Sequence, residues 1–347
     1  MRIAQVAPLF ESVPPQTYGG TERVVSYLTE ELVRQGHDVT LFASGDSVTK
    51  ARLVACHERS LRLDPTCIDG LAHQIVQLEQ VFKRAGEFDA VHFHIDYVHY
   101  PLSRRERIPH VTTLHGRLDI PDLVPLYREF HEMPVISISD AQREPLPWLN
   151  WVDTVYHGLP DDLYTLREQP GTYLAFLGRI SPEKRVDRAI EIARRAGLPL
   201  RIAAKIDKAD EEYFEGTIRP LLEGSHVEFV GEIGEAEKDE FLGNAYALLF
   251  PIDWPEPFGL VMVEAMACGT PVIAYRDGSV PEVLDEGATG FIVTDEDEAI
   301  EALEDVPQLD RRECRRVFEE RFSAARMARD YVGIYERIVE GHPVWKS

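Results

Sequence analysis

The chain alternates short apolar segments with amphipathic helical segments, and it does so in two successive series. The predicted strands of the first series are 2–8, 37–44, 88–94, 110–116, 134–140 and 153–158. Those of the second series are 172–179, 198–205, 227–232, 247–251, 271–275 and 289–293. The segments Thr21–Arg34, Val186–Ala196 and Phe258–Cys268 repeat apolar residues at helical spacing. Apolar strands that alternate with helices are typical of doubly wound parallel sheets, so the sequence predicts an α/β protein.

The two series predict two domains. With 347 residues the chain is too long for one ordinary core. A stretch rich in Pro, Gly and Asp without periodicity covers 159–171, and we expect it to be the linker. The first domain is then expected over 1–158 and the second over 172–306, and the pattern beyond Val306 is purely helical. Ligands of such domains bind at the carboxyl ends of the strands, so the loops after strands are where chemistry is expected.

Charge and composition exclude several classes of partner. The net charge of −23 disfavours nucleic acid and anionic membranes, which would repel the chain. No apolar run approaches the roughly 20 residues that span a bilayer. The first residues are expected to form a strand rather than a signal peptide. Four cysteines without a CxxC pair indicate reduced thiols, and we expect a cytoplasmic location.

Two cations follow the first strand of the second series. Arg179 comes directly after Gly178, and Lys184 lies five residues later, before a predicted helix. Cations at a strand exit beside a helix N-terminus can neutralise a diphosphate, although a solvated loop is the commoner explanation for such a pair taken alone. The chain lacks both the GxGxxG fingerprint and the Walker lysine signature, which argues against a nicotinamide cofactor or ATP.

The segment PEPFGLVMVEAMACGTP (255–271) places two carboxylates eight positions apart. Glu256 lies on a proline-rich loop, and Glu264 lies inside an apolar helix that we expect to begin near Gly259. A buried carboxylate is costly unless it is paired, so a hydroxyl-rich ligand such as ribose could bind Glu264. The alternative is that Glu264 pairs with an arginine and that Glu256 points to water.

Several of these segments resemble motifs of the retaining family 4 glycosyltransferases, which have the two-domain GT-B fold. EPFGLVMVE (256–264) resembles the family's E-x7-E motif, and GRISPEK (178–184) resembles its Gly-Arg…Lys diphosphate clamp. YGGTERVV (18–25), LHG (114–116), SISDAQR (137–143) and residues 264–291 resemble further family blocks in the same order. The resemblance implies two Rossmann-like domains that face a cleft, and a final helix, within 322–347, that belongs to the first domain.

The resemblance also implies roles for individual residues. Glu264 would hold the ribose and Glu256 the donor sugar, while Arg179 and Lys184 would stabilise the departing diphosphate. His115 would contact the sugar near the reacting carbon. Backbone groups would bind phosphate or sugar at Gly19 and Gly20, and at Phe258, Gly259, Leu260 and Val261.

Asp140, Lys205 and a group of three strand residues leave alternatives open. Asp140 ends a predicted strand and could orient a substrate, or it could cap the helix that follows. Lys205 stands where the family usually has an Ala-Gly-x-Gly exit, and it could add a phosphate or base contact or cover the cleft edge. His92, His94 and Asp96 share one face of a strand, as in a metal site, although buried strand histidines explain the pattern better. Arg185 departs from the family pattern, which often has glycine there.

Taken together, these features predict an enzyme of the hexosyltransferase class. It would move a sugar from a nucleoside-diphosphate sugar, with UDP or GDP favoured, to a hydroxyl of a sugar, glycan or small molecule. In the family, a phosphate oxygen of the donor accepts the acceptor's proton on the front face, so no enzymic nucleophile, metal or cofactor is expected. The alternatives are a sugar-nucleotide epimerase of the same fold, a pyridoxal-dependent phosphorylase and a non-catalytic binding protein.

Overall fold

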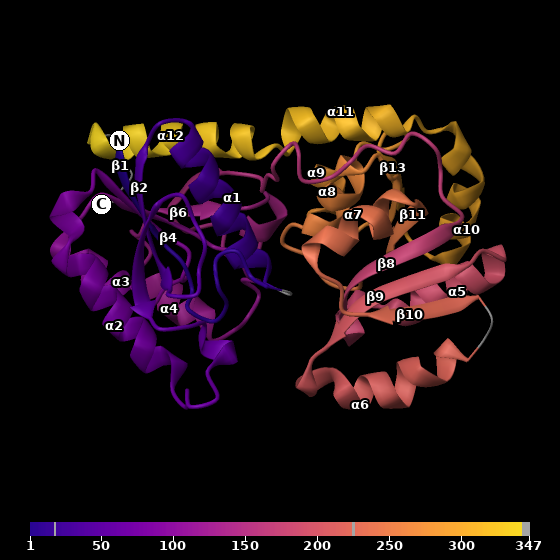
Figure 1. Cartoon of the computed structure of the whole chain (residues 1–347), viewed down its shortest axis with the longest axis horizontal. Helices are drawn as coiled ribbons and strands as arrows, with labels where there is room; N and C mark the ends of the chain where they lie inside the picture. Colours follow the sequence, from indigo (N-terminus) through magenta and orange to yellow (C-terminus); the bar gives the residue numbers. More distant parts are fainter. Residues whose placement is uncertain (17–18, 224–225, 342–347) are drawn as a thin grey trace. The chain divides into compact units, whose positions relative to one another are not determined.

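The computed structural model describes residues 1–16, 19–223 and 226–341 and divides the chain into two compact units. Unit 1 comprises residues 1–160 and 324–347, and unit 2 comprises residues 161–323. Each unit has its own parallel sheet, its own helices and its own buried apolar residues (Figure 1). No helix within the described ranges is both long and apolar enough to cross a membrane.

The sheet of unit 1 has the strand order β3-β2-β1-β4-β5-β6-β7, and every neighbouring pair is parallel. Its strands are β1 (Arg2–Val6), β2 (Asp38–Ser44), β3 (Arg52–His57), β4 (Ala90–Phe93), β5 (His110–Thr113), β6 (Val135–Ser137) and β7 (Trp151–Thr154). The order reverses between β1 and β4. In a doubly wound sheet the crevice for a ligand opens at such a reversal, beyond the carboxyl ends of the strands.

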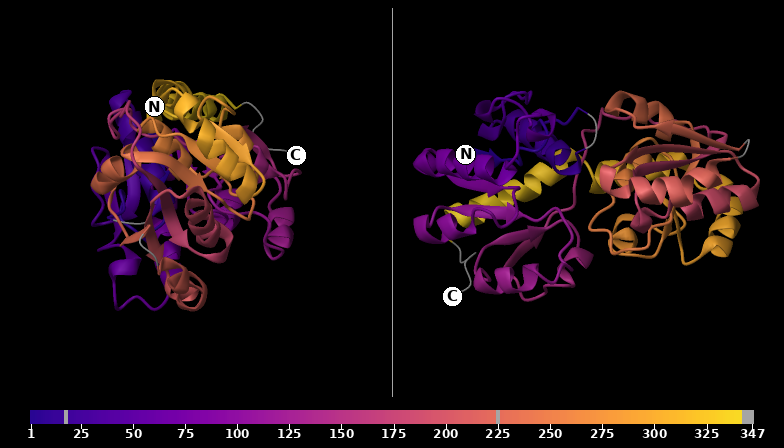
Figure 2. Two further views of the ribbon diagram at one scale, coloured as in Figure 1. Left: turned by 90° about the vertical axis from the view of Figure 1, so that its right-hand side faces the viewer. Right: turned by 90° about the horizontal axis from the view of Figure 1, so that it is seen from below.

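Helices cover both faces of this sheet. They are α1 (Gly20–Arg34), α2 (Gly70–Lys83), α3 (Tyr100–Glu106), α4 (Leu123–Glu129) and α12 (Ala324–Val339). Leu78 and Val81 of α2 pack with Phe42 and Phe93 on one face, and Val25 of α1 packs with Leu41 on the other. Helix α12 contacts α1 and β4, and Figure 2 shows it among the elements of unit 1. The final helix therefore completes the first unit although it is far from it in sequence.

The sheet of unit 2 has the order β10-β9-β8-β11-β12-β13 and is also parallel throughout. Its strands are β8 (Tyr173–Ile180), β9 (Leu200–Ile206), β10 (Val227–Gly231), β11 (Ala245–Phe250), β12 (Val272–Tyr275) and β13 (Gly290–Val293). Its helices are α5 (Val186–Ala196), α6 (Glu211–Tyr213), α7 (Glu235–Gly243), α8 (Leu260–Ala267), α9 (Val280–Val283), α10 (Glu296–Asp305) and α11 (Arg311–Arg321). Here the strand order reverses between β8 and β11.

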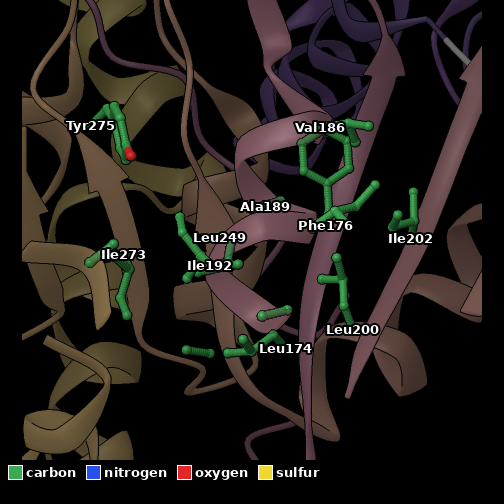
Figure 3. Packing of buried hydrophobic residues seen from close by; sticks show 14 of the residues in the cluster. Leu174, Phe176, Val186, Ala189, Ile192, Leu200, Ile202, Leu249, Ile273 and Tyr275 are labelled. Atoms are coloured by element: carbon green, nitrogen blue, oxygen red, sulfur yellow. The ribbon is translucent and has the colours of Figure 1, made fainter. Parts of the chain in front are cut away.

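One apolar cluster of unit 2 joins the sheet to α5 and α10. Figure 3 shows Val186, Ala189 and Ile192 of α5 with Phe176 of β8, Ile202 of β9 and Leu249 of β11, and Val186 lies beside Phe176. These side chains are almost fully buried, and burial of a large aliphatic or aromatic side chain contributes about 1.5–3 kcal/mol. The cluster includes Leu174, Phe176 and Ile180 of β8 and Leu249 of β11, the two central strands from which the loops of the candidate site leave.

Two sequence-based expectations differ from the structure. Strand β3 was not predicted, because its residues lie at the edge of the sheet and are only half buried, so the apolar signal is weak. The stretch 159–171 was expected to be a linker, but residues 161–171 belong to unit 2. Arg167 anchors this stretch, since its backbone N–H donates to the Cys268 carbonyl and its guanidinium pairs with Asp239 at 3.0 Å.

Candidate functional site

The loops after β8 and β11 meet at the strand reversal of unit 2. Lys184 lies on a short 3-10 turn after β8, and Glu256 lies on the loop after β11. The Lys184 ammonium donates to Glu256 Oε2, and the Trp254 indole N–H donates to the same oxygen at 3.1 Å. The ammonium also lies 5.0 Å from the centre of the Trp254 ring, a cation–π distance. Two residues that the sequence assigned to the donor site are thus in direct contact.

The Glu256 loop is held by backbone contacts. The Ser279 N–H donates to the Glu256 carbonyl at 3.0 Å. Gly278 has a φ of +50°, and a Cβ atom there would come within 2.4 Å of the Glu256 backbone, so this close approach requires glycine. The carboxylate of Glu256 is therefore presented from a fixed backbone position.

Arg179 and Lys205 are neighbours across the sheet, because Arg179 of β8 pairs in register with Lys205 of β9. Arg179 lies 2.6 Å from a Glu183 oxygen and 3.7 Å from carboxylate oxygens of both Asp207 and Asp210. Lys205 lies 2.9 Å from Asp207. Two cations at the end of adjacent strands can bind a diphosphate, but the neighbouring carboxylates would compete with the diphosphate for these two cations.

Helix α8 begins at the site. Its N-cap is Gly259, with a φ of +76°, and a Cβ there would lie 2.6 Å from the Met262 side chain. Leu260 and Val261 are the first two helical residues, so their N–H groups belong to the helix N-terminus, which favours anions. Phe258, before the cap, is buried against Phe322 with ring centres 6.1 Å apart. The predicted start of this helix near Gly259 is confirmed.

Glu264 lies in the second turn of α8 and its side chain is only 4% exposed. Lys238 of α7 donates to its Oε1 at 2.7 Å, and the Tyr164 hydroxyl, which donates to Glu235, lies 3.3 Å from the same oxygen. The sequence analysis gave an ion pair between Glu264 and an arginine as an alternative. Glu264 does form an ion pair, but its partner is Lys238. A carboxylate that is buried here needs such compensation.

In unit 1, His115 lies directly beyond β5. Its Nε2 is 2.8 Å from Nδ1 of His94, which follows β4, and its ring stacks on His157 at 5.3 Å. Burial lowers the pKa of His115 to about 3, so the ring is neutral at physiological pH. The Gln142 amide donates to the carbonyls of Leu114 and Gly116 at 2.9 and 2.8 Å. Gln142 therefore fixes the loop that carries His115.

Asp140 does not cap the short helix that follows it, so that expectation is wrong. The Ser139 hydroxyl instead accepts from the Gln142 N–H at 3.0 Å. Asp140 is mostly exposed and accepts a hydrogen bond from Thr154 at 2.6 Å. Gly19 is the N-cap of α1 and Gly20 its first residue, and a Cβ on Gly19 would lie 2.8 Å from Pro15. Tyr18, in the quoted motif, lies outside the described residues.

His92 and His94 are buried strand-end histidines, as the preferred interpretation predicted. His92 contacts Tyr335 and Thr113 through its two ring nitrogens, at 2.7 and 2.8 Å. Within 1–16, 19–223 and 226–341, no three His, Cys, Asp or Glu side chains are grouped so that they could hold a metal ion.

Comparison with known proteins identifies the family. The family model for glycosyltransferase family 4 matches residues 18–157, and the model for glycosyl transferases group 1 matches residues 165–321. Together the two models cover most of the chain, one in each unit. The chain is a family 4 glycosyltransferase. N-acetyl-α-D-glucosaminyl L-malate synthase of Bacillus anthracis is 27% identical to this transferase over 91% of the chain and 93% of the relative.

Solved structures agree with the fold of the transferase. AviGT4, a glycosyltransferase involved in avilamycin A biosynthesis, superposes with a TM-score of 0.76 at 24% identity, over 98% of each chain. Anabaena HepE in complex with UDP-glucose superposes with a TM-score of 0.71 at 19% identity, over 97% of this chain and 99% of that one. The transferase therefore has the GT-B fold, with two Rossmann-like units.

The sequence did not predict that Lys238 supports Glu264 or that Gln142 supports the loop of His115. Lys238 lies in a mostly polar helix, and nothing in its spacing indicates that it reaches Glu264. Gln142 lies in the SISDAQR segment (137–143), and the resemblance of this segment to the family was the one sequence feature that could have indicated its role. Arg185 stands where the family often has glycine. Its φ of +51° is the left-handed conformation that glycine adopts at least cost, which accounts for glycine at this position in the family pattern.

Proposed function

We propose that this transferase moves a sugar from a nucleoside-diphosphate sugar to a hydroxyl acceptor with retention at the anomeric carbon. The observation that carries the proposal is the contact between Lys184 and Glu256 at the strand reversal of unit 2. A cation that meets a carboxylate beside a helix N-terminus fits a ligand with both phosphate and hydroxyl groups. The UDP-glucose bound to HepE, a protein of the same fold, is a donor of this class.

The proposed mechanism uses the donor's own phosphate. The bond between the anomeric carbon and the diphosphate oxygen breaks, and the acceptor oxygen bonds to the same face of that carbon. A phosphate oxygen of the leaving group accepts the acceptor's proton, so no enzymic nucleophile is needed. Arg179 and Lys184 stabilise the charge that develops on the leaving diphosphate, which is where preorganised cations lower the barrier most.

The remaining residues bind and orient the donor. Glu256 accepts hydrogen bonds from sugar hydroxyls, and Glu264 accepts from the ribose. The N–H groups of Leu260 and Val261 donate to phosphate oxygens, which Gly259 lets approach the backbone. His115 contacts a sugar hydroxyl, Gly19 and Gly20 give access to backbone N–H groups, and Asp140 orients the acceptor. Lys205 adds a phosphate contact beside Arg179.

The proposal includes no resident cofactor, because the cations supply the charge that a metal would otherwise provide. UDP and GDP are the favoured nucleotides. We also propose a cytoplasmic location, where Cys56, Cys67, Cys268 and Cys314, which are all free, would stay reduced.

A thermal-shift panel of UDP, GDP, ADP and their sugars tests the proposal. A ligand at 100 times its Kd stabilises the protein by about 2.7 kcal/mol, which is visible as a raised melting temperature. We expect a shift with one nucleoside diphosphate and its loss in Lys184→Ala. No shift with any nucleotide would contradict the donor site. Sugar epimerisation without transfer would support an epimerase, and visible pyridoxal absorbance would support a phosphorylase.

A further inference from the structure

A continuous series of hydrogen bonds, partly buried at His115 and buried beyond His94, joins His115 to the last helix of unit 1. His115 Nε2 lies 2.8 Å from His94 Nδ1, and His94 Nε2 lies 2.8 Å from Gln5 Oε1. The Gln5 amide N–H in turn donates to the Tyr335 hydroxyl of α12 at 3.1 Å. Gln5 and Tyr335 are fully buried and His94 is 3% exposed. Gln5 is thus the one polar residue within β1 that faces this series.

The orientation of the Gln5 amide decides where the protons lie. The amide oxygen can only accept, so His94 must carry its proton on Nε2. His94 is neutral, because burial lowers its pKa well below the usual value, so its Nδ1 is a lone pair. That lone pair accepts from His115, whose proton is therefore on Nε2.

The remaining nitrogen of His115 is then an acceptor. Its Nδ1 is buried and makes no hydrogen bond with the part of the chain that the structure describes. A buried N–H without a partner is rarer and more costly than a lone pair without one, which favours the same tautomer. A buried acceptor without a partner also needs an explanation, and a ligand is the natural one for a residue beyond the carboxyl end of a central strand.

We propose that Gln5 is a positioning residue that, through His94, holds His115 in the Nε2–H tautomer, so that His115 Nδ1 accepts a hydrogen bond from a substrate hydroxyl. The identity of the substrate rests on the proposed function, but the tautomer of His115 does not. An acceptor at His115 Nδ1 limits which group of the substrate His115 can bind. A phosphate oxygen carries no proton to donate at neutral pH, whereas a sugar hydroxyl does. His115 therefore binds a hydroxyl of the donor or acceptor and not the diphosphate.

Three substitutions separate this role from general stability. Gln5→Glu keeps an acceptor for His94 and so keeps the tautomer of His115. Gln5→Met has nearly the same shape but removes the acceptor. Gln77→Met is the matched control: Gln77 is also fully buried in unit 1, and its amide donates to the Ala7 and Phe42 carbonyls at 2.8 and 3.2 Å.

Long-range ¹H–¹⁵N NMR of the full chain, labelled with ¹⁵N-histidine, is the decisive measurement. A His115→Gln variant identifies the His115 signals by their loss. We expect a protonated Nε2 and an unprotonated Nδ1 in the wild type, in Gln5→Glu and in Gln77→Met. Gln5→Met should shift the ring toward a mixture of tautomers. A His115 ring protonated at Nδ1 in the wild type would overturn the proposal, even if Gln5→Met did not fold.

Kinetics then test the consequence for the substrate. We expect Gln5→Met to lower kcat/KM for transfer at least tenfold, with the Kd of the free nucleoside diphosphate unchanged, and Gln5→Glu to recover most of the loss. An equal loss in Gln77→Met would show that Gln5 acts through stability alone. Failure of the nucleotide shift would contradict the proposed function and leave the NMR result intact, so the two failures are distinguishable.

Discussion

Lys184 and Glu256 are 72 positions apart in the sequence, yet the Lys184 ammonium donates directly to the Glu256 carboxylate. The side chains are only 18% and 13% exposed, so solvent screens this contact less than it screens a surface pair. Lys184 lies on the loop after β8 and Glu256 on the loop after β11. These two central strands of unit 2 are neighbours at the reversal of strand order, which brings the two residues together. The topology itself therefore builds the site.

Lys184→Ala and Glu256→Ala should each lower turnover by about 10²-fold or more, because each removes a preorganised charge contact. The measurement is the initial rate of nucleoside diphosphate release from the donor. Arg194→Ala is a suitable control, since Arg194 forms an exposed pair with Glu191 on α5 of the same unit. Near-normal rates in both variants would refute the assignment of these two residues.

Asp207→Asn should strengthen nucleoside diphosphate binding. Asp207 lies 2.9 Å from Lys205 and 3.7 Å from Arg179, and a diphosphate would have to replace these contacts. A partly exposed ion pair contributes about 0.2–1 kcal/mol, so the expected decrease in Kd is roughly 1.4- to fivefold. Calorimetric titration measures it, with Asp297→Asn as control, because Asp297 pairs with Arg195 on the surface of the same unit. Weaker binding in Asp207→Asn would mean that Asp207 itself holds the ligand.

The fold was largely predictable because its signals are local. Helix α5 runs over Val186–Ala196 as predicted, since its apolar period ends at Gly197, a residue in the left-handed conformation. The supports of the site were not predictable in the same way. Gln5 lies within β1, whose other buried residues are apolar, and Lys238 lies within a polar helix, and their partners are distant in sequence. Local patterns describe which face is buried, but they do not pair polar side chains across a fold.

Lys238→Met should destabilise unit 2, because it leaves the buried Glu264 carboxylate without its cation. Removal of one partner of a buried ion pair costs about 3 kcal/mol or more. Urea unfolding monitored by circular dichroism measures the loss. Addition of Glu264→Gln to Lys238→Met should recover part of the stability, since the uncompensated charge is then removed. If the double variant were as unstable as the single one, packing rather than charge would explain the effect.

Acid should unfold unit 1 through its buried histidines. Burial lowers the pKa of His92, His94, His99 and His157 well below the usual value, that of His110 to about 4 and that of His115 to about 3. The unfolded chain binds protons that the folded chain does not, so stability falls as the pH drops below about 6.5. The pH dependence of the unfolding free energy near pH 5.5 measures this proton uptake.

A substitution of His99 tests separately whether buried histidines cause the loss of stability in acid. It is buried between Ser103 and Thr112, with hydrogen bonds of 2.7 and 2.8 Å, and it lies outside the series that ends at His115. His99→Gln should lower the proton uptake on unfolding near pH 5.5 by up to about one proton, whatever it does to stability at pH 8. An unchanged slope would show that His99 takes up its proton in the folded state as well.

The contribution of Asp96 to folding stability should depend on pH in the opposite direction to that of the buried histidines. Burial raises the pKa of its carboxyl to about 6, so the folded chain holds this proton more tightly than the unfolded chain, and stability falls as the pH rises from about 4 to about 6. Asp96→Asn removes the charge and keeps the backbone, since asparagine also tolerates the left-handed φ of +50° found there. We expect Asp96→Asn to be more stable than the wild type by about 1–3 kcal/mol at pH 8, and the gain to vanish near pH 4. Melting temperatures of both proteins across this range measure the difference. A gain that persisted unchanged at pH 4 would show that the charge of Asp96 is not its cause.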